Sequence, residues 1–103
     1  MADEPSPMMR LKRTTEAGNL WLYVLSLVSK NKVYAYGLRD EINKKFGWRP
    51  GLITSYIVLY KLESEGLIAS EFEGRRKYYT ITQKGKDTLS EAKEYLKKLA
   101  SKL

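Results

Sequence analysis

The hydrophobic residues of this chain are spaced for helices in its first two thirds and at its end, and for strands in between. The first helical pattern predicts a helix that begins near Thr14 or Asn19 and ends at Ser29. Its apolar stripe, widened by Trp21, predicts a helix covered on more than one side. Residues 1–9 contain two prolines and no period, and they predict a flexible N-terminal tail.

Two further helices are predicted over residues 37–46 and 52–65. The segment between them, GWRPG over residues 47–51, favours a turn because glycine and proline adopt the backbone angles of turns. Gly66 is typical of a helix end. The helical spacing places four residues on the inner face of the second of these helices: Leu52, Tyr56, Leu59 and Leu62.

An alternating pattern then predicts two strands joined by a tight hairpin over residues 73–76. One face of the first strand carries Ile68, Ser70 and Phe72, and one face of the second carries Tyr79 and Ile81. Thr82 is placed to cap a last helix that runs to about Lys102. The apolar residues of that helix follow steps of 3 and 4, as in a heptad seam: Leu89, Ala92, Leu96, Leu99 and Leu103.

The order of these elements predicts a mainly α fold with a small β-hairpin (α+β), namely a winged helix-turn-helix over residues 10–82. Residues 83–103 are then a C-terminal dimerisation helix, and Leu20, Trp21 and Val24 form a second layer of that dimer interface. The alternative is that the last helix packs on its own domain.

The net charge of the chain indicates the kind of partner that it binds. The chain has 19 Lys and Arg against 12 Asp and Glu, a formal net charge of +7, which favours nucleic acid first and an anionic membrane surface second. It has no cysteine and no histidine, and we find no nucleophile–base pair, metal-ligand set or phosphate-binding loop. We therefore expect no enzyme, no cofactor and no metal. No apolar run reaches the roughly 18 residues of a membrane span, so we expect a cytoplasmic protein.

The helix predicted over residues 52–65 is the recognition helix of this fold, which enters the major groove of DNA. Its outward residues can contact phosphates, base edges and thymine methyl groups: Thr54, Ser55, Ile57, Tyr60 and Lys61. Tyr56 is ambiguous between core and contact, and we assign it to the core. The alternative is an ordinary surface helix with one lysine.

The hairpin is the wing of this fold, and its tip over residues 73–77 carries the densest positive charge in the chain. The predicted contact residues are Gly74, which permits the turn, with Arg75, Arg76 and Lys77 on phosphates or in the minor groove. The alternative is a solvated run of charge. Weaker candidates for contacts with the DNA backbone are Arg39, Lys44, Lys45 and Arg49.

Three segments together resemble the PadR family of winged-helix transcription regulators: LYVLSLVSKNKVYAYGLRDEI, LYKLESEGLI and EGRRKYYTITQKG. The resemblance covers roughly residues 22–89. It implies a homodimer that binds operator DNA and usually represses transcription. Some members of the family respond to small aromatic ligands, and Trp21 and Trp48 are the residues here that could line such a cavity. Two other interpretations stay open, a sequence-independent architectural nucleic-acid binder and a winged helix used as a protein-interaction module.

Overall fold

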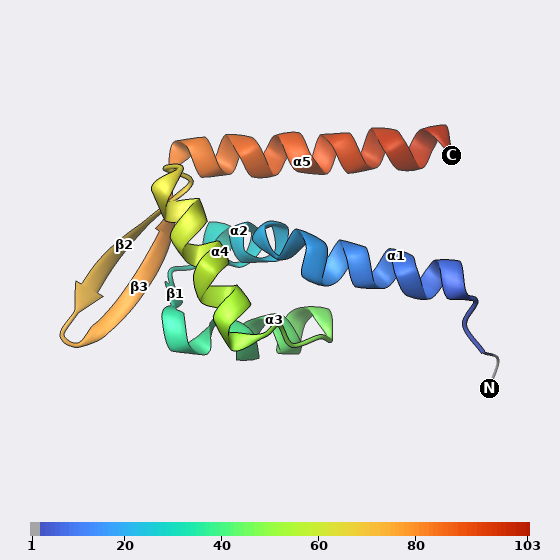
Figure 1. Ribbon diagram of the computed structural model, residues 1–103. Helices are drawn as coiled ribbons and strands as arrows, with labels where there is room; N and C mark the ends of the chain where they lie inside the picture. Colours follow the sequence, from blue (N-terminus) through green and yellow to red (C-terminus); the bar gives the residue numbers. More distant parts are fainter. Residues whose placement is uncertain (1–2) are drawn as a thin grey trace.

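The computed structural model describes residues 3–103 and shows a bundle of helices with a long hairpin projecting from it (Figure 1). The elements are α1 (Ser6–Glu16), the 3-10 turn η1 (Ala17–Asn19), α2 (Leu20–Lys30), β1 (Val33–Tyr34), the 3-10 turn η2 (Ala35–Gly37), α3 (Leu38–Phe46), α4 (Leu52–Ser64), β2 (Ile68–Glu73), β3 (Arg76–Ile81) and α5 (Gln83–Lys102). The predicted mainly α winged helix-turn-helix is confirmed.

The hydrophobic core is built around α2, which packs against α3, α4, β3 and α5. Five residues of α2 are buried, and they lie on more than one of its sides: Leu20, Val24, Leu25, Leu27 and Val28. Leu38 and Ile42 of α3 and Leu59 of α4 complete the centre of the core. The prediction of a helix covered on several sides is therefore confirmed, and its apolar surface is what holds α3 and α4 in place.

The sheet has three antiparallel strands in the order β1–β3–β2. β2 and β3 form the predicted hairpin, with Ile68 opposite Ile81 and Glu73 opposite Arg76. β1 was not predicted, because two residues are too few to show an alternating pattern. Along one face of β2, Ile68 is buried, Ser70 is partly buried and Phe72 is 68 % exposed, because the hairpin extends away from the core.

The helix-turn-helix matches the sequence prediction to within one residue at each helix end. Gly47 ends α3 with a φ of 79°, a left-handed conformation that glycine adopts without strain. The inner face of α4 differs from the prediction, since its buried residues are Ser55, Leu59 and Leu62. Leu52 and Tyr56 are 49 % and 39 % exposed, so assigning them to the core was wrong.

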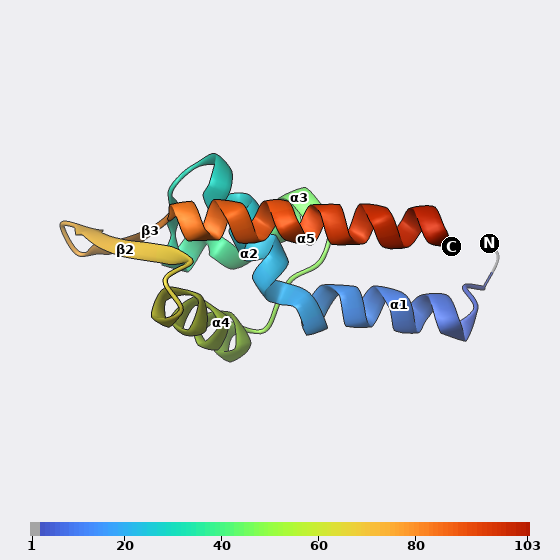
Figure 2. The same cartoon turned by 90° about the horizontal axis from the view of Figure 1, so that it is seen from above.

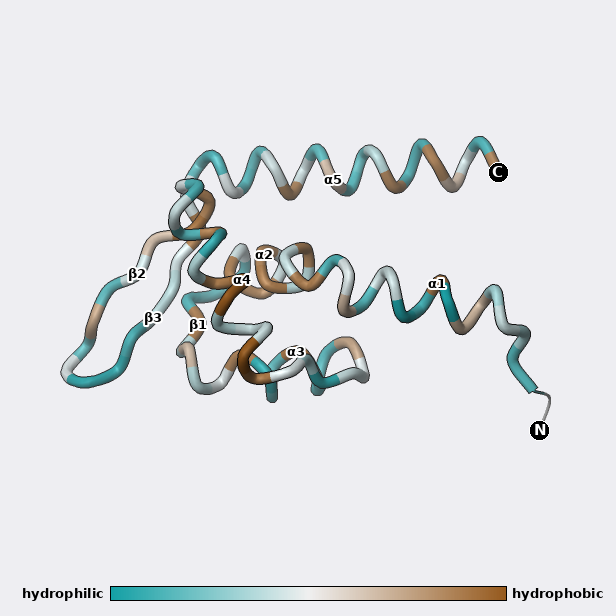
Figure 3. Tube along the Cα trace, viewed as in Figure 1, coloured by the Kyte–Doolittle hydropathy of each residue, from teal (hydrophilic) through white to brown (hydrophobic). Residues whose placement is uncertain are grey.

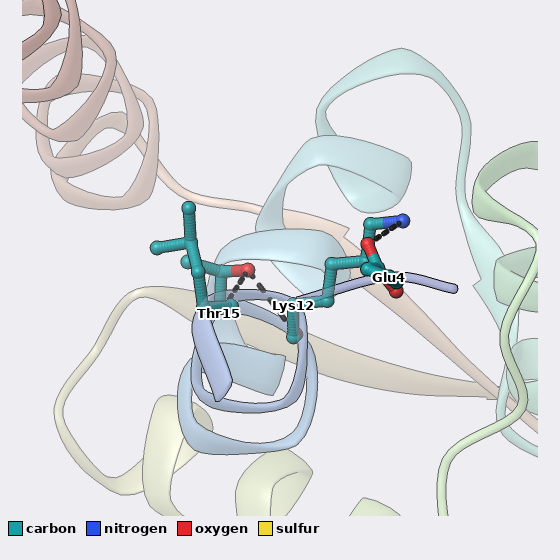
Figure 4. A network of polar contacts seen from close by, with 4 residues as sticks. Glu4, Lys12 and Thr15 are labelled. Carbon is teal, nitrogen blue, oxygen red and sulfur yellow. Dashed lines mark hydrogen bonds and ion pairs between the residues drawn. The ribbon is translucent and has the colours of Figure 1, made fainter. Parts of the chain in front are cut away.

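The N-terminal region also differs from the prediction. Residues 1–2 of the expected tail lie outside the described residues. The chain is helical from Ser6 onward, so the prediction of a tail without regular structure was wrong for residues 6–9. Pro7 lies in the first turn of α1, where a missing N–H costs no hydrogen bond. An ion pair joins Glu4 to Lys12 at 2.7 Å, and the Thr15 hydroxyl donates to the Leu11 carbonyl (Figure 4).

α5 begins as predicted, because the Thr82 side chain accepts a hydrogen bond from the backbone N–H of Gly85 at 3.0 Å. Leu89 is buried, whereas Leu96, Leu99 and Leu103 further along are 45, 44 and 97 % exposed. α5 and α1 both extend beyond the core, in the same direction (Figure 2). Among residues 3–103, none of the helices is both long and apolar enough to span a membrane.

Candidate nucleic-acid interface

The outer face of α4 is the surface that the sequence assigns to DNA recognition. Because Ser55, Leu59 and Leu62 point into the protein, the residues half a turn away from them point outward. Ile53, Ile57 and Tyr60 are 75, 50 and 73 % exposed. The remaining predicted contacts on this face, Thr54 and Lys61, are also exposed. Figure 3 shows hydrophobic and intermediate colours along α4 until the helix nears β2.

Ser55 is the exception among the predicted recognition residues. It is only 3 % exposed, and its hydroxyl donates to the backbone carbonyl of Gly51 at 2.7 Å. This hydrogen bond uses the hydroxyl proton inside the first turn of α4, and burial keeps the side chain away from any surface that DNA could contact. The prediction of Ser55 as a contact is wrong, and its role is to fix the start of the helix.

The wing tip turns through Gly74, whose φ of 65° explains why a glycine is needed there. The three cations around the turn are placed differently. The Arg76 guanidinium lies 5.2 Å from the ring centroid of Tyr34, and the Lys77 ammonium lies 3.9 Å from a carboxylate oxygen of Glu63. Within the described residues, the Arg75 side chain has no ion pair, hydrogen bond or aromatic contact, so it is the cation offered at the tip.

The base of the wing is held by stacked tyrosines. Tyr34 of β1 lies 5.5 Å from Tyr78 of β3 and 5.8 Å from Tyr36, measured between ring centroids. Lys32 pairs with Glu73 across the sheet, and this hydrogen bond raises the pKa of Lys32. A hydrogen bond with Tyr78 raises the pKa of Arg76. Lys32 and Arg76 therefore stabilise the hairpin, and both stay positively charged at neutral pH.

The four flanking cations divide into two groups. Arg39 donates through its Nε to the carbonyl of Pro50 at 2.9 Å, and Arg49 pairs with Asp40, so both lie by the turn that leads into α4. Lys44 is exposed on α3. The ammonium of Lys30 lowers the pKa of Lys45. Lys45 is also near Lys93 of α5, which groups it with α2 and α5 rather than with α4 and the wing.

The structure contradicts three residues of the predicted dimer interface, Leu20, Val24 and Leu89, because they are buried in the core of this chain. Leu20 and Val24 are 2 % and 0 % exposed inside this chain, so they belong to its own core and leave no surface for a second copy. Trp21 is partly buried and lines a groove of about 570 Å³ between α2 and α5, together with Ala92 and Leu96. Leu89 is buried within the chain, while the seam residues beyond Ala92 are exposed.

Trp48 does not line that groove, contrary to the expectation of a shared cavity with Trp21. It stacks edge-on against Tyr23 with ring centroids 5.1 Å apart, and Tyr23 in turn stacks on Phe46 at 4.8 Å. Burial raises the pKa of Tyr23, and Glu16 adds to the effect. This aromatic cluster ties α2 to the end of α3.

Sequence reasoning missed two exposed residues on this side of the molecule. Ile53 lies one helical turn before Ile57, and the same spacing that places Leu59 and Leu62 inward would have placed Ile53 outward. Tyr36 is 74 % exposed at the start of α3, next to Arg39 and Tyr56 around a small cavity. No periodic pattern marks it, because it lies in the short turn η2.

Residues 24–91 match the family described as the Transcriptional regulator PadR-like family. The Transcriptional regulator Rv3488 of Mycobacterium tuberculosis is 34 % identical over an alignment of 83 residues, and the match covers 77 % of this chain and 77 % of that protein. A PadR-like transcription factor from Bacteroides fragilis has a TM-score of 0.75 and 26 % identity, covering 90 % of this chain and 94 % of its own. A PadR family transcriptional regulator from Eggerthella lenta has a TM-score of 0.75 and 29 % identity, covering 91 % and 82 %.

Proposed function

The chain belongs to the PadR-like family of transcriptional regulators, and we propose that it acts as a homodimer that binds duplex DNA by sequence and represses transcription. In this proposal α4 lies in the major groove, and the wing over residues 73–77 lies on the DNA backbone or in the minor groove. The family and its named relatives are transcriptional regulators rather than enzymes. A chromosomal operator as target implies a protein of the cytoplasm.

The observation that carries the proposal is the exposed face of α4 beside a cationic hairpin. An α-helix fits the major groove, which is about 12 Å wide in B-form DNA. The opposite stripe of α4 is fixed in the core by Leu59 and Leu62, so the helix is held rigidly with one face free. Lys61 on α4 itself and Arg75 at the wing tip supply exposed positive charge.

The dimer is supported by the second half of α5. Residues beyond Ala92 are exposed along the helix, and an isolated helical segment of fewer than about 12 residues is marginal in water. The apolar row of Leu96, Leu99 and Leu103 gains burial if a second copy packs against it. A two-fold axis through this interface would present two α4 helices to half-sites about one DNA turn apart or more.

The wing is tested by measuring the salt dependence of binding to a duplex from upstream of the protein's own gene. For Arg75→Ala we expect weaker binding and a log–log salt slope smaller by about 0.9 for each phosphate that is no longer neutralised, hence about 1.8 for a dimer. Lys98→Ala, which removes one exposed charge from α5, is the matched control and should leave the slope unchanged. An unaltered slope in Arg75→Ala would contradict the proposed role of the wing.

Two rival functions give different results in the same assay. A sequence-independent architectural protein would bind the upstream duplex and a shuffled duplex equally well, since its net charge of +7 would suffice. A protein-interaction module would show no salt-sensitive binding to either. We expect a preference for the upstream duplex of about a thousandfold or more at physiological salt, the lower end of what specific regulators show.

A subsidiary proposal concerns an aromatic effector. The groove between α2 and α5 is lined by the ring of Trp21 and by Glu91, a combination suited to a cationic aromatic molecule. Titration with such a dye should quench tryptophan fluorescence in the parent protein and leave Trp21→Phe unchanged. Equal quenching in both would place the dye elsewhere and remove this proposal.

A further inference from the structure

We infer that α4 distinguishes DNA sequences chiefly through the methyl groups of thymine, rather than through hydrogen bonds to guanine or adenine. The inference rests on the proposed function, and it adds the chemical feature of DNA that the recognition helix reads. The outer face of α4 carries two exposed isoleucines and, before Lys61, no arginine, lysine, asparagine or glutamine.

The side chains available for hydrogen-bonded readout are few. Guanine is usually read by arginine or lysine and adenine by asparagine or glutamine. Residues 52–60 contain no charged side chain and no amide side chain. The Ser55 hydroxyl is buried and bonded to Gly51, which leaves only the hydroxyls of Thr54, Tyr56 and Tyr60. The first charged residue is Lys61, about two and a half helical turns after the start of α4.

The two isoleucines occupy the centre of the outer face. Ile53 and Ile57 are four residues apart, so their side chains are neighbours about 6 Å apart on the helix surface. With Tyr60 they form a continuous apolar strip that is at least half exposed at every position. β-Branched residues are poor helix formers, and a solvated helix face is better served by Lys or Glu. The strip is therefore a contact surface, and its chemistry is apolar.

The charges around this strip favour DNA over an apolar protein partner. Three acidic residues of the wing and turn region are paired, Glu63 with Lys77, Glu73 with Lys32 and Asp40 with Arg49, whereas Glu71 of β2 is exposed and forms no ion pair among the described residues. Lys61 of α4 and Arg75 of the wing tip are exposed and form no ion pair among the described residues. A major groove supplies both matching features, because thymine methyl groups project from its floor and phosphates line its edges.

The experiment begins with the full chain and a duplex library that has a random core of about two DNA turns, enough for two half-sites. The tightest duplex is then remade with each thymine replaced singly by deoxyuridine, which removes the methyl group and keeps the hydrogen-bonding atoms. We expect about fourfold weaker binding at each thymine that an isoleucine contacts, from the transfer free energy of one buried carbon. At those positions 5-methylcytosine should bind about fourfold more tightly than cytosine, for the same reason.

Variants connect the effect to α4. In Ile57→Ala, at least one thymine should lose its sensitivity to deoxyuridine, and a different thymine should lose it in Ile53→Ala. Phe72→Ala removes an equally exposed apolar side chain from the wing and should retain every deoxyuridine effect. Thermal unfolding checks that the variants fold, and Ile57→Val, a smaller change, should show an intermediate sensitivity.

The outcomes separate this inference from the proposed function. If a duplex is selected and bound but every deoxyuridine version binds within about twofold of it, well short of the effect of one methyl group, methyl readout is wrong while sequence-specific DNA binding stands. The same conclusion follows if both isoleucine variants keep the full deoxyuridine effect at every position. If no duplex is selected above random DNA, the proposed function fails and the inference fails with it.

Discussion

At the scale of single residues, the junction between β3 and α5 is tightly constrained. The Leu67 carbonyl accepts hydrogen bonds from the backbone and the hydroxyl of Thr82, at 3.2 and 3.0 Å. This pulls the Leu67 backbone close to the first turn of α5. A Cβ built on Gly85 would lie 2.1 Å from the Leu67 oxygen and 2.7 Å from a side-chain carbon of Ile81. No side chain fits at position 85.

We therefore expect Gly85→Ala to destabilise the fold by about 3 kcal/mol, the upper end of the usual cost of overpacking, because the obstacle is backbone that is itself hydrogen-bonded. Urea unfolding followed by circular dichroism measures the change. Gly18→Ala is the matched control, since a Cβ there meets nothing within 4 Å. It should lie within about 1 kcal/mol of the parent protein. Equal stability of the two variants would show that the junction relaxes freely.

Single residues also show where sequence patterns fail. On α4 the pattern of apolar residues favoured Leu52 and Tyr56 as inner positions, yet the buried stripe runs through Ser55. A serine can occupy a core-facing position because its hydroxyl finds a carbonyl one turn back. A pattern of hydrophobic residues does not reveal that hydrogen bond. The outward prediction for Tyr60 was correct, because it follows directly from the inward phase of Leu59 and Leu62.

At the scale of elements, the wing is a hairpin held at its base and free at its tip. β1 pairs with β3 through Val33 opposite Tyr79 and Tyr34 opposite Tyr78. Tyr34 also receives the Arg76 guanidinium over its ring. This two-residue strand thus sets the direction of a hairpin whose far end lies away from the core (Figure 1).

Tyr34→Ala should loosen the wing without unfolding the protein. The substitution removes two aromatic pairs, with Tyr36 and Tyr78, and a cation–π interaction with Arg76, each on the order of 1 kcal/mol. We expect amide hydrogen exchange in residues 76–79 to accelerate about tenfold or more, while exchange in α2 stays unchanged. Tyr34→Phe keeps the ring and should behave like the parent protein. Slow exchange in both variants would mean that β2 alone holds β3 in place.

The elements could be predicted to different degrees, and the reasons are physical. α2 to α5 and the hairpin follow strong periodic patterns, and the structure confirms them. β1 is too short for a pattern, and α1 carries a proline that is tolerated because it lies in the first turn. The cations of the wing were predicted as one group, but neighbours on β1 and α4 decide which of them stays free. Only the fold brings those neighbours together.

At the scale of the whole molecule, the chain is elongated, with extents of 49 × 29 × 20 Å. The length comes from α1 and α5, which extend past the core on the same side (Figures 1 and 2). Both carry exposed apolar residues along this extension, among them Met9 and Leu11 on α1 and Leu99 on α5. A single copy leaves this surface in water. A second copy packed against it would complete a hydrophobic core for both extensions.

We expect Leu99→Asp to convert the proposed dimer into a monomer, because a carboxylate in an apolar seam lacks a partner and its burial is strongly unfavourable. Sedimentation equilibrium gives the mass, and circular dichroism should show the core still folded, since Leu99 is 44 % exposed in the single chain. Ser101→Asp adds the same charge on the opposite face of α5 and should remain dimeric. If the parent protein has the mass of a single chain at every concentration, the seam does not form a dimer interface. A dimeric Leu99→Asp would place the interface elsewhere. If the variant is monomeric, its affinity for operator DNA shows how much of the binding depends on dimerisation and how much on α4 alone.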